Sequence, residues 1–128
     1  MTEAYCLALY GMLVLLTLLL QVTGAMNQLG IGYLLSSRDE HRSVTGMTAR
    51  LDRALANSIT SMALFAPAVL LLLATDKTSA GSALAAQVFL IGRIVYLPAY
   101  VFRLVGIRTL AWLVAFAATA MLYLLVLR

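Results

Sequence analysis

The chain has 128 residues, of which 63% are hydrophobic and only 11% are charged, and its mean hydropathy is +0.99. This composition lies outside the range of soluble proteins and leaves no room for a separate soluble domain. The net charge of +4 does not indicate nucleic-acid binding, because the arginines are dispersed and form no basic tract interleaved with aromatic residues. A single cysteine excludes an internal disulfide and a multi-cysteine metal site.

Four long apolar stretches fill nearly all of the chain. A helix of about 20 apolar residues crosses a bilayer, because all its backbone hydrogen bonds are made within the segment. The sequence therefore predicts an all-α integral membrane protein, a four-helix bundle that forms one domain over residues 1–128. The expected helices cover about 4–24, 48–74, 80–102 and 108–127.

The connections differ in length and charge. Residues 25–47 form the longest polar connection, a candidate lid or interfacial element. Six basic residues belong to the first and third connections and the helix starts beside them, and two belong to the other side. The six are Arg38, Arg42, Arg50, Arg53, Arg103 and Arg108, and the two are Lys77 and Arg128. Basic residues favour the cytoplasmic side, so both termini are expected outside. The short loops suggest a bacterial inner membrane.

Two helices carry polar side chains that do not suit lipid. Helical spacing places each set on one face. The set on 48–74 is Arg50, Arg53, Asn57, Thr60, Ser61 and Leu64, and the set on 80–102 is Arg93, Tyr96, Tyr100 and Arg103. Unpaired charges in a membrane cost a few kcal/mol each. Two stripes facing each other would form a positive cleft suited to an anionic ligand. Alternatively, these polar groups form hydrogen bonds with one another between packed helices, and the arginines extend to lipid phosphates. Arg38, Arg42 and Arg103 are expected to be such membrane anchors.

Three segments resemble one protein family. Residues 53–65 (RALANSITSMALF) are similar to the R-A-x-x-N-x-x-E-x-x-x-x-F signature of the MAPEG superfamily, the membrane-associated proteins in eicosanoid and glutathione metabolism. Residues 93–100 (RIVYLPAY) resemble its R-x-x-Y-x-x-x-Y motif, and residues 108–112 (RTLAW) resemble the R-[ST] opening of its fourth helix. The resemblance covers the chain from about residue 48 to the end, and the first helix by topology only.

The resemblance implies a homotrimer that binds glutathione as co-substrate in clefts between neighbouring subunits, near the cytoplasmic face. The positions that match the family's glutathione-binding residues are Arg53, Asn57, Arg93, Tyr96 and Tyr100. Thr60 occupies one more of these binding positions with a different residue, and it is kept as a binding candidate. Arg108 resembles the arginine that stabilises the glutathione thiolate. A thiol of pKa about 8.5 becomes nucleophilic where a fixed cation favours its charged form.

One position departs from the family pattern. Thr60 stands where the family has a glutamate, and a hydroxyl supplies no charge to pair with an ammonium or an arginine. Losing a charged partner in a partly buried site costs a few kcal/mol of binding. Either Asp39, Glu40 or Asp52 substitutes, or the ligand differs, or the cleft is not catalytic. The spacing after Arg93 also leaves Arg103 as a competitor of Arg108.

The leading hypothesis is a glutathione-dependent transferase or peroxidase that acts on lipophilic electrophiles. The alternative is a non-catalytic relative that holds a lipid or a partner protein in the same cleft. A small multidrug transporter is disfavoured, because no carboxylate lies inside the third or fourth helix or between residues 4 and 37. We expect membrane lipids and a lipophilic small molecule as partners, and no nucleic acid. His41 is a lone histidine in a polar loop, so no metal site is expected.

Overall fold

The computed structural model describes residues 1–128 and contains only helices. They are α1 (Glu3–Leu29), α2 (Ile31–Leu34), α3 (Gly46–Ala74), α4 (Ala80–Val101) and α5 (Val105–Leu127). All except α2 are long and apolar enough to cross a membrane. The protein is therefore an integral membrane protein with four candidate spans, as its sequence predicts.

Two helix ends differ clearly from the prediction. α1 does not end near Gly24 but runs on to Leu29. Gly24 lies where α1 approaches Thr48 of α3 so closely that no larger side chain would fit. Gly24 therefore serves packing, and the helix stops only at Gly30, whose φ of 84° favours a glycine. α5 likewise begins earlier than expected, at Val105.

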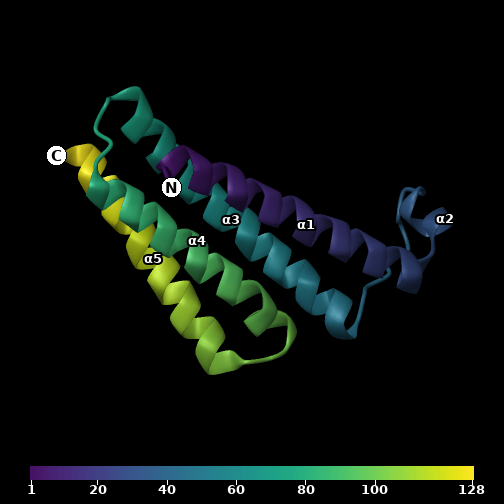
Figure 1. Ribbon diagram of the computed structural model, residues 1–128. Coiled ribbons are helices and arrows are strands. Elements are labelled where there is room, and N and C mark those ends of the chain that lie inside the picture. Colours follow the sequence, from purple (N-terminus) through teal and green to yellow (C-terminus); the bar gives the residue numbers. More distant parts are fainter.

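The helices form two pairs, α1 with α3 and α4 with α5 (Figure 1). Both chain termini lie at one end of the bundle, here called the terminal end. The α1–α3 and α4–α5 connections lie at the opposite end, toward which the two pairs diverge (Figure 1). This second end is here called the arginine end, because six arginines lie in or beside its connections. They are Arg38, Arg42, Arg50, Arg53, Arg103 and Arg108.

The core that holds the two pairs together contains three aromatic rings in contact. Phe65 of α3 and Phe89 of α4 stack with centroids 3.8 Å apart, and Tyr10 of α1 meets Phe89 edge-on at 4.9 Å. Small alanines and leucines complete this core, which extends toward the terminal end. Membrane helices associate through close packing rather than through burial from water. The terminal end is therefore the well-packed part of the bundle.

α4 and α5 approach each other closely at Gly92. A β-carbon on this residue would lie 3.1 Å from the carbonyl oxygen of Ala111 and 3.3 Å from the β-carbon of Ala115. Small residues at such crossings let two membrane helices come into backbone contact. This contact fixes Arg93, the next residue on α4, relative to Trp112 on α5.

Candidate functional site

The polar stripes of α3 and α4 meet at the arginine end. The Nε of Arg50 donates a hydrogen bond to the carbonyl oxygen of Val101 at 2.7 Å. The Nε of Arg53 donates to the hydroxyl of Tyr100 at 3.3 Å. The two stripes therefore contact each other, and part of their hydrogen-bonding capacity is used between the helices.

Arg93 is a buried charge without a counter-ion. Its side chain is 1% exposed, and Nη2 donates to the hydroxyl of Ser58 at 3.1 Å. The guanidinium lies over the ring of Tyr96, with Cζ 4.2 Å from the centroid, and 5.9 Å from the ring centroid of Tyr10. Nε and Nη1 have no hydrogen-bond partner. The only ion pair in the protein joins Arg42 to Glu40, in the connection between α1 and α3. A buried cation in this state is costly unless a ligand supplies acceptors.

Ser58 is itself held in place by Tyr10. The hydroxyl of Tyr10 on α1 donates to the backbone carbonyl oxygen of Ser58 at 2.8 Å, and all three side chains of this cluster are buried. α1 and α3 thus fix the residue that receives the hydrogen bond from Arg93. One nitrogen of the Arg93 guanidinium, Nη2, is therefore held by a hydrogen bond, whereas Nε and Nη1 donate to nothing.

Two tyrosine rings of α4 lie in a line between an arginine of α4 and an arginine of α5. Arg93 stacks on Tyr96, whose ring centroid is 5.6 Å from that of Tyr100. The guanidinium of Arg108 lies 4.9 Å from the ring centroid of Tyr100. Cations over aromatic faces are attracted by the ring quadrupole, more strongly where water is scarce. Four of the predicted site residues are therefore neighbours in space.

These residues line two adjoining hollows that share Trp112. The larger, here called the α3–α5 groove, has a volume of about 370 Å³ and includes Asn57, Thr60 and Arg93. The smaller, here called the arginine-end hollow, has a volume of about 240 Å³. Its lining consists of Tyr96, Tyr100, Arg108, Thr109 and Trp112. The predicted site is thus divided between a groove along the membrane-spanning helices α3 and α5 and a hollow at the arginine end.

Two arginines of the predicted set lie elsewhere. Arg53 lines a third hollow of about 380 Å³ between α1, α3 and the loop before α3, and reaches the others only through Tyr100. Arg103 is exposed in the α4–α5 turn with a φ of 65°, and it lines neither the groove nor the arginine-end hollow. Arg103 and Arg108 were the two candidates for the thiolate-stabilising arginine, and Arg108 is the one that lies beside Tyr100.

No carboxylate of the chain lines the groove or the arginine-end hollow. The hydroxyl of Thr60 donates to the carbonyl oxygen of Ala56 in its own helix at 3.1 Å. The three acids that could substitute for the missing glutamate are hydrogen-bonded elsewhere. Asp39 accepts from Ser37, Glu40 pairs with Arg42, and Asp52 accepts from Gln21. Within the chain, no carboxylate replaces the missing glutamate beside the groove.

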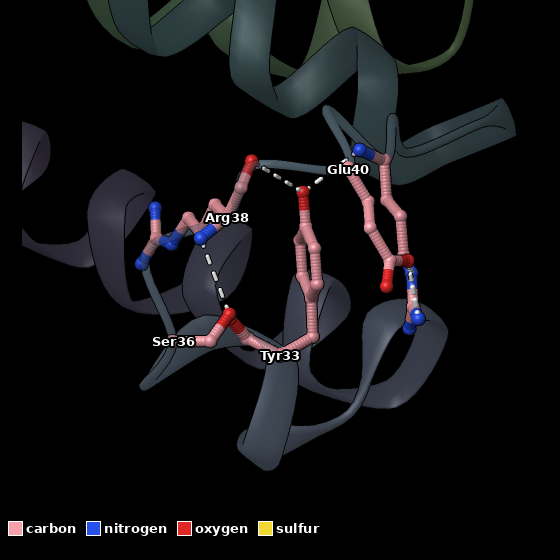
Figure 2. A network of polar contacts seen from close by, with 5 residues as sticks. Tyr33, Ser36, Arg38 and Glu40 are labelled. Atoms are coloured by element: carbon pink, nitrogen blue, oxygen red, sulfur yellow. Dashed lines mark hydrogen bonds and ion pairs between the residues drawn. The ribbon is translucent and has the colours of Figure 1, made fainter.

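The loop before α3, which follows α2, is organised around Tyr33 of α2 (Figure 2). Its hydroxyl donates to the carbonyl oxygen of Arg38 at 3.4 Å and accepts from the backbone nitrogen of Arg42 at 2.7 Å. The guanidinium of Arg42 covers the ring at 4.7 Å and pairs with Glu40 at 2.6 Å. None of these residues lines the α3–α5 groove or the arginine-end hollow. The predicted lid is an internally bonded loop beside the third hollow.

Three residues of the site were not predicted as such. Tyr10 lies on the first helix, which the motifs do not cover, and Ser58 lies between two motif positions. Trp112 ends the motif at residues 108–112, in which a function was predicted for Arg108 alone. The signal that could have marked it is that it is the only tryptophan of the chain.

Comparison with known proteins gives one match. The family model described as the MAPEG family matches residues 2–128, essentially the whole chain. No curated protein and no solved structure matches it. The match includes the first helix, which the sequence motifs did not cover.

Proposed function

The chain belongs to the MAPEG family, as its three motifs predict, and we propose that it is a glutathione-dependent transferase or peroxidase. Its second substrate would be a lipophilic electrophile that arrives from the bilayer. Family membership and four apolar helices support a membrane protein of glutathione or eicosanoid metabolism.

The observation that carries the proposal is a set of buried polar atoms without hydrogen-bond partners on Arg93 and Asn57, two residues that line the α3–α5 groove. Arg93 leaves two donors without partners, and the Oδ1 of Asn57 is an acceptor without one. A ligand that satisfies them must bring both acceptors and donors. Glutathione does, through its carboxylates, ammonium and peptide groups. A fatty acid anion brings acceptors only, so these atoms favour the tripeptide over simple lipid binding.

Arg108 is the residue that we propose for the reaction itself. It lies beside Tyr100 in the arginine-end hollow, whose lining also includes Trp112. A fixed guanidinium close to a thiol favours the thiolate, which is the nucleophile in conjugation and in peroxide reduction alike. Glutathione would therefore place its thiol in this hollow and its other polar groups toward Arg93 and Asn57.

Thr60 limits the proposed affinity. Because no carboxylate faces the groove, the ammonium of glutathione would lack an ionic partner within the subunit. We therefore expect weaker binding than in a relative with a glutamate at this position, by a few kcal/mol at most.

The assembly and orientation belong to the same proposal. We propose a homotrimer with α3 near its threefold axis, since α3 carries an excess of small residues that let membrane helices approach. The small residues are Ala54, Ala56, Ser58, Ser61, Ala63 and Ala66. The arginine end would face the cytoplasm, with both termini outside, in a bacterial inner membrane.

The test is catalysis by the purified protein in detergent. Glutathione is supplied with a lipophilic aryl halide in one assay and with a lipid hydroperoxide in another, and thioether or glutathione disulfide is measured. Product above the uncatalysed rate in either assay supports the proposal and identifies the chemistry. Tight glutathione binding without product in either would replace the enzyme with the non-catalytic alternative.

A further inference from the structure

The third hollow, of about 380 Å³, shares no lining residue with the α3–α5 groove or the arginine-end hollow. Three guanidinium groups and one carboxylate line it, those of Arg38, Arg42, Arg53 and Asp52. Asp52 accepts a hydrogen bond from Gln21 at 3.3 Å and forms an ion pair with none of the arginines. Apolar side chains complete much of the lining; they are Ala25, Leu29, Leu34, Val44 and Ala49. The hollow therefore combines an excess of positive charge with apolar surface.

The two ends of the loop beside the hollow are joined through one side chain. Gln28 of α1 accepts from the backbone nitrogen of Thr45 at 2.8 Å, and its Nε2 donates to the carbonyl oxygen of Thr45 at 3.0 Å. Thr45 is the residue before α3, so this pair of hydrogen bonds ties the end of α1 to the start of α3. The residues between them therefore form a closed loop that stays beside the two helices.

Tyr33 fixes the backbone of both loop arginines (Figure 2). Its hydroxyl joins the carbonyl oxygen of Arg38 to the backbone nitrogen of Arg42. Arg38 is also held by Ser36, whose hydroxyl accepts from the Arg38 backbone nitrogen at 3.2 Å. This support matters because the φ of Arg38 is 59°, a left-handed conformation that costs free energy in residues other than glycine. The two arginines therefore have defined positions, unlike the basic residues of a diffuse positive surface.

Both loop guanidinium groups keep donors that the protein does not use. Arg38 donates from Nε and Nη2 to the carbonyl oxygen of Leu34, at 3.2 Å and 3.0 Å. Arg42 uses the same two nitrogens on Glu40. Nη1 of neither group donates within the chain. These donors belong to residues that line the hollow, so an anion there would find them free.

We propose that the third hollow binds a phosphate group. A guanidinium is a planar, permanently charged fork that matches phosphate oxygens, and three of them outweigh the single carboxylate of Asp52. The apolar lining, and the place of the hollow at one end of the spanning helices, favour an anionic membrane lipid over a soluble phosphate ester. Arg38 and Arg42 are then ligands of one phosphate, whereas Arg103 lies outside the hollow and is a general anchor. Because neither loop arginine lines the groove or hollow proposed for glutathione, the phosphate site does not depend on the proposed function.

Native mass spectrometry of the delipidated protein in detergent measures this binding. The probes are phosphatidylglycerol, phosphatidylcholine and glycerol 1-phosphate, which are an anionic lipid, a zwitterionic lipid and a soluble phosphate ester. We expect phosphatidylglycerol to bind saturably and more tightly than phosphatidylcholine. An excess of glycerol 1-phosphate then identifies the source of the phosphate. Bound phosphatidylglycerol that stays in place assigns the site to a lipid, and its displacement assigns the site to a soluble ester.

Variants separate a defined site from general attraction of charge. Arg42→Gln should weaken phosphatidylglycerol binding at least roughly fivefold, the effect expected of one basic residue at an anionic lipid surface. Tyr33→Phe keeps every charge but loses the hydroxyl that joins the loop arginines, and it should weaken binding about threefold. Arg103→Gln is the matched control, because it removes the same charge from the arginine end but from a residue outside the hollow. It should change the dissociation constant by less than about twofold, since salt screens exposed charges.

Glu40→Gln provides a gain of binding that misfolding cannot imitate. It releases Arg42 from its ion pair, so phosphatidylglycerol should bind at least roughly twofold more tightly. Asp39→Asn is the matched control, because Asp39 carries the same charge but accepts from Ser37 rather than from an arginine.

Two patterns would overturn the proposal. The first is equal weakening in Arg42→Gln and Arg103→Gln without an effect of Tyr33→Phe, as attraction to a diffuse positive surface would produce. The second is phosphatidylglycerol that binds the wild-type protein no more tightly than phosphatidylcholine does, together with no measurable binding of glycerol 1-phosphate. Neither pattern would bear on glutathione binding, which is measured separately.

Discussion

Replacing Arg93 by methionine should separate stability from ligand binding. Arg93 is buried with one hydrogen bond, to Ser58, and one close aromatic contact, to Tyr96. The charged hydrogen bond contributes about 1.5–3 kcal/mol. The desolvated cation–π contact adds about 1–2 kcal/mol. Against these stands a cost of about 2.5–3.5 kcal/mol for an arginine inside a membrane helix.

The midpoints of these opposing ranges nearly cancel, so Arg93→Met should change the free energy of unfolding by only about 1 kcal/mol. An apolar side chain of similar length can even stabilise such a site. Glutathione binding should respond differently, because the ligand loses two charged donors. We expect a loss of about 2–3 kcal/mol of binding, which is roughly 30- to 140-fold in Kd.

Thermal unfolding with and without glutathione, followed by calorimetric titration, measures both quantities in one preparation. Arg128→Met is the control, because this exposed arginine lies at the terminal end, far from both hollows. It should change neither quantity. A large loss of thermal stability with unchanged glutathione affinity would refute the reasoning and make Arg93 a purely structural residue.

Three further predictions concern the site and the assembly. Asn57→Ala should weaken glutathione binding by calorimetry, and Thr60→Glu should tighten it by supplying the missing charge; an unchanged or lower affinity in Thr60→Glu would contradict the alignment or the ligand. Arg108→Ser should lower conjugation of a lipophilic aryl halide at least roughly tenfold, about 1.4 kcal/mol of transition-state stabilisation. Arg108→Lys should keep little of the wild-type conjugation activity, because an ammonium lacks the planar fork of a guanidinium. Full activity in Arg108→Ser would move the role to Arg103. Mass measurement in mild detergent should give a trimer, and a clean monomer would exclude one.

Much of the fold follows from the distribution of charge. The apolar stretches contain so few charged residues that only membrane helices can satisfy their backbones, and α3 and α4 lie close to where the sequence predicts them. Helix ends were harder to predict. Gly24 has the character of a helix end, yet it is a packing contact with Thr48, and only tertiary structure reveals that contact.

The site was predictable where spacing alone determines proximity. Arg93, Tyr96 and Tyr100 are three and four residues apart on one helix, so their stacking follows from the helical repeat. The support of Arg93 by Tyr10 and Ser58 could not be predicted, because it depends on which face of α1 packs against α3. The placement of Arg103 outside the hollows depends on its left-handed turn, which no motif specifies.

The most direct test of the central claim is titration of the wild-type protein with glutathione while the ultraviolet absorbance of the thiolate is recorded. The account predicts saturable binding and a thiolate signal near neutral pH, well below the ordinary thiol pKa of about 8.5. In Arg108→Ser the binding should persist and the thiolate signal should be lost. Glutathione that fails to bind, or that binds entirely as the thiol, would contradict the account.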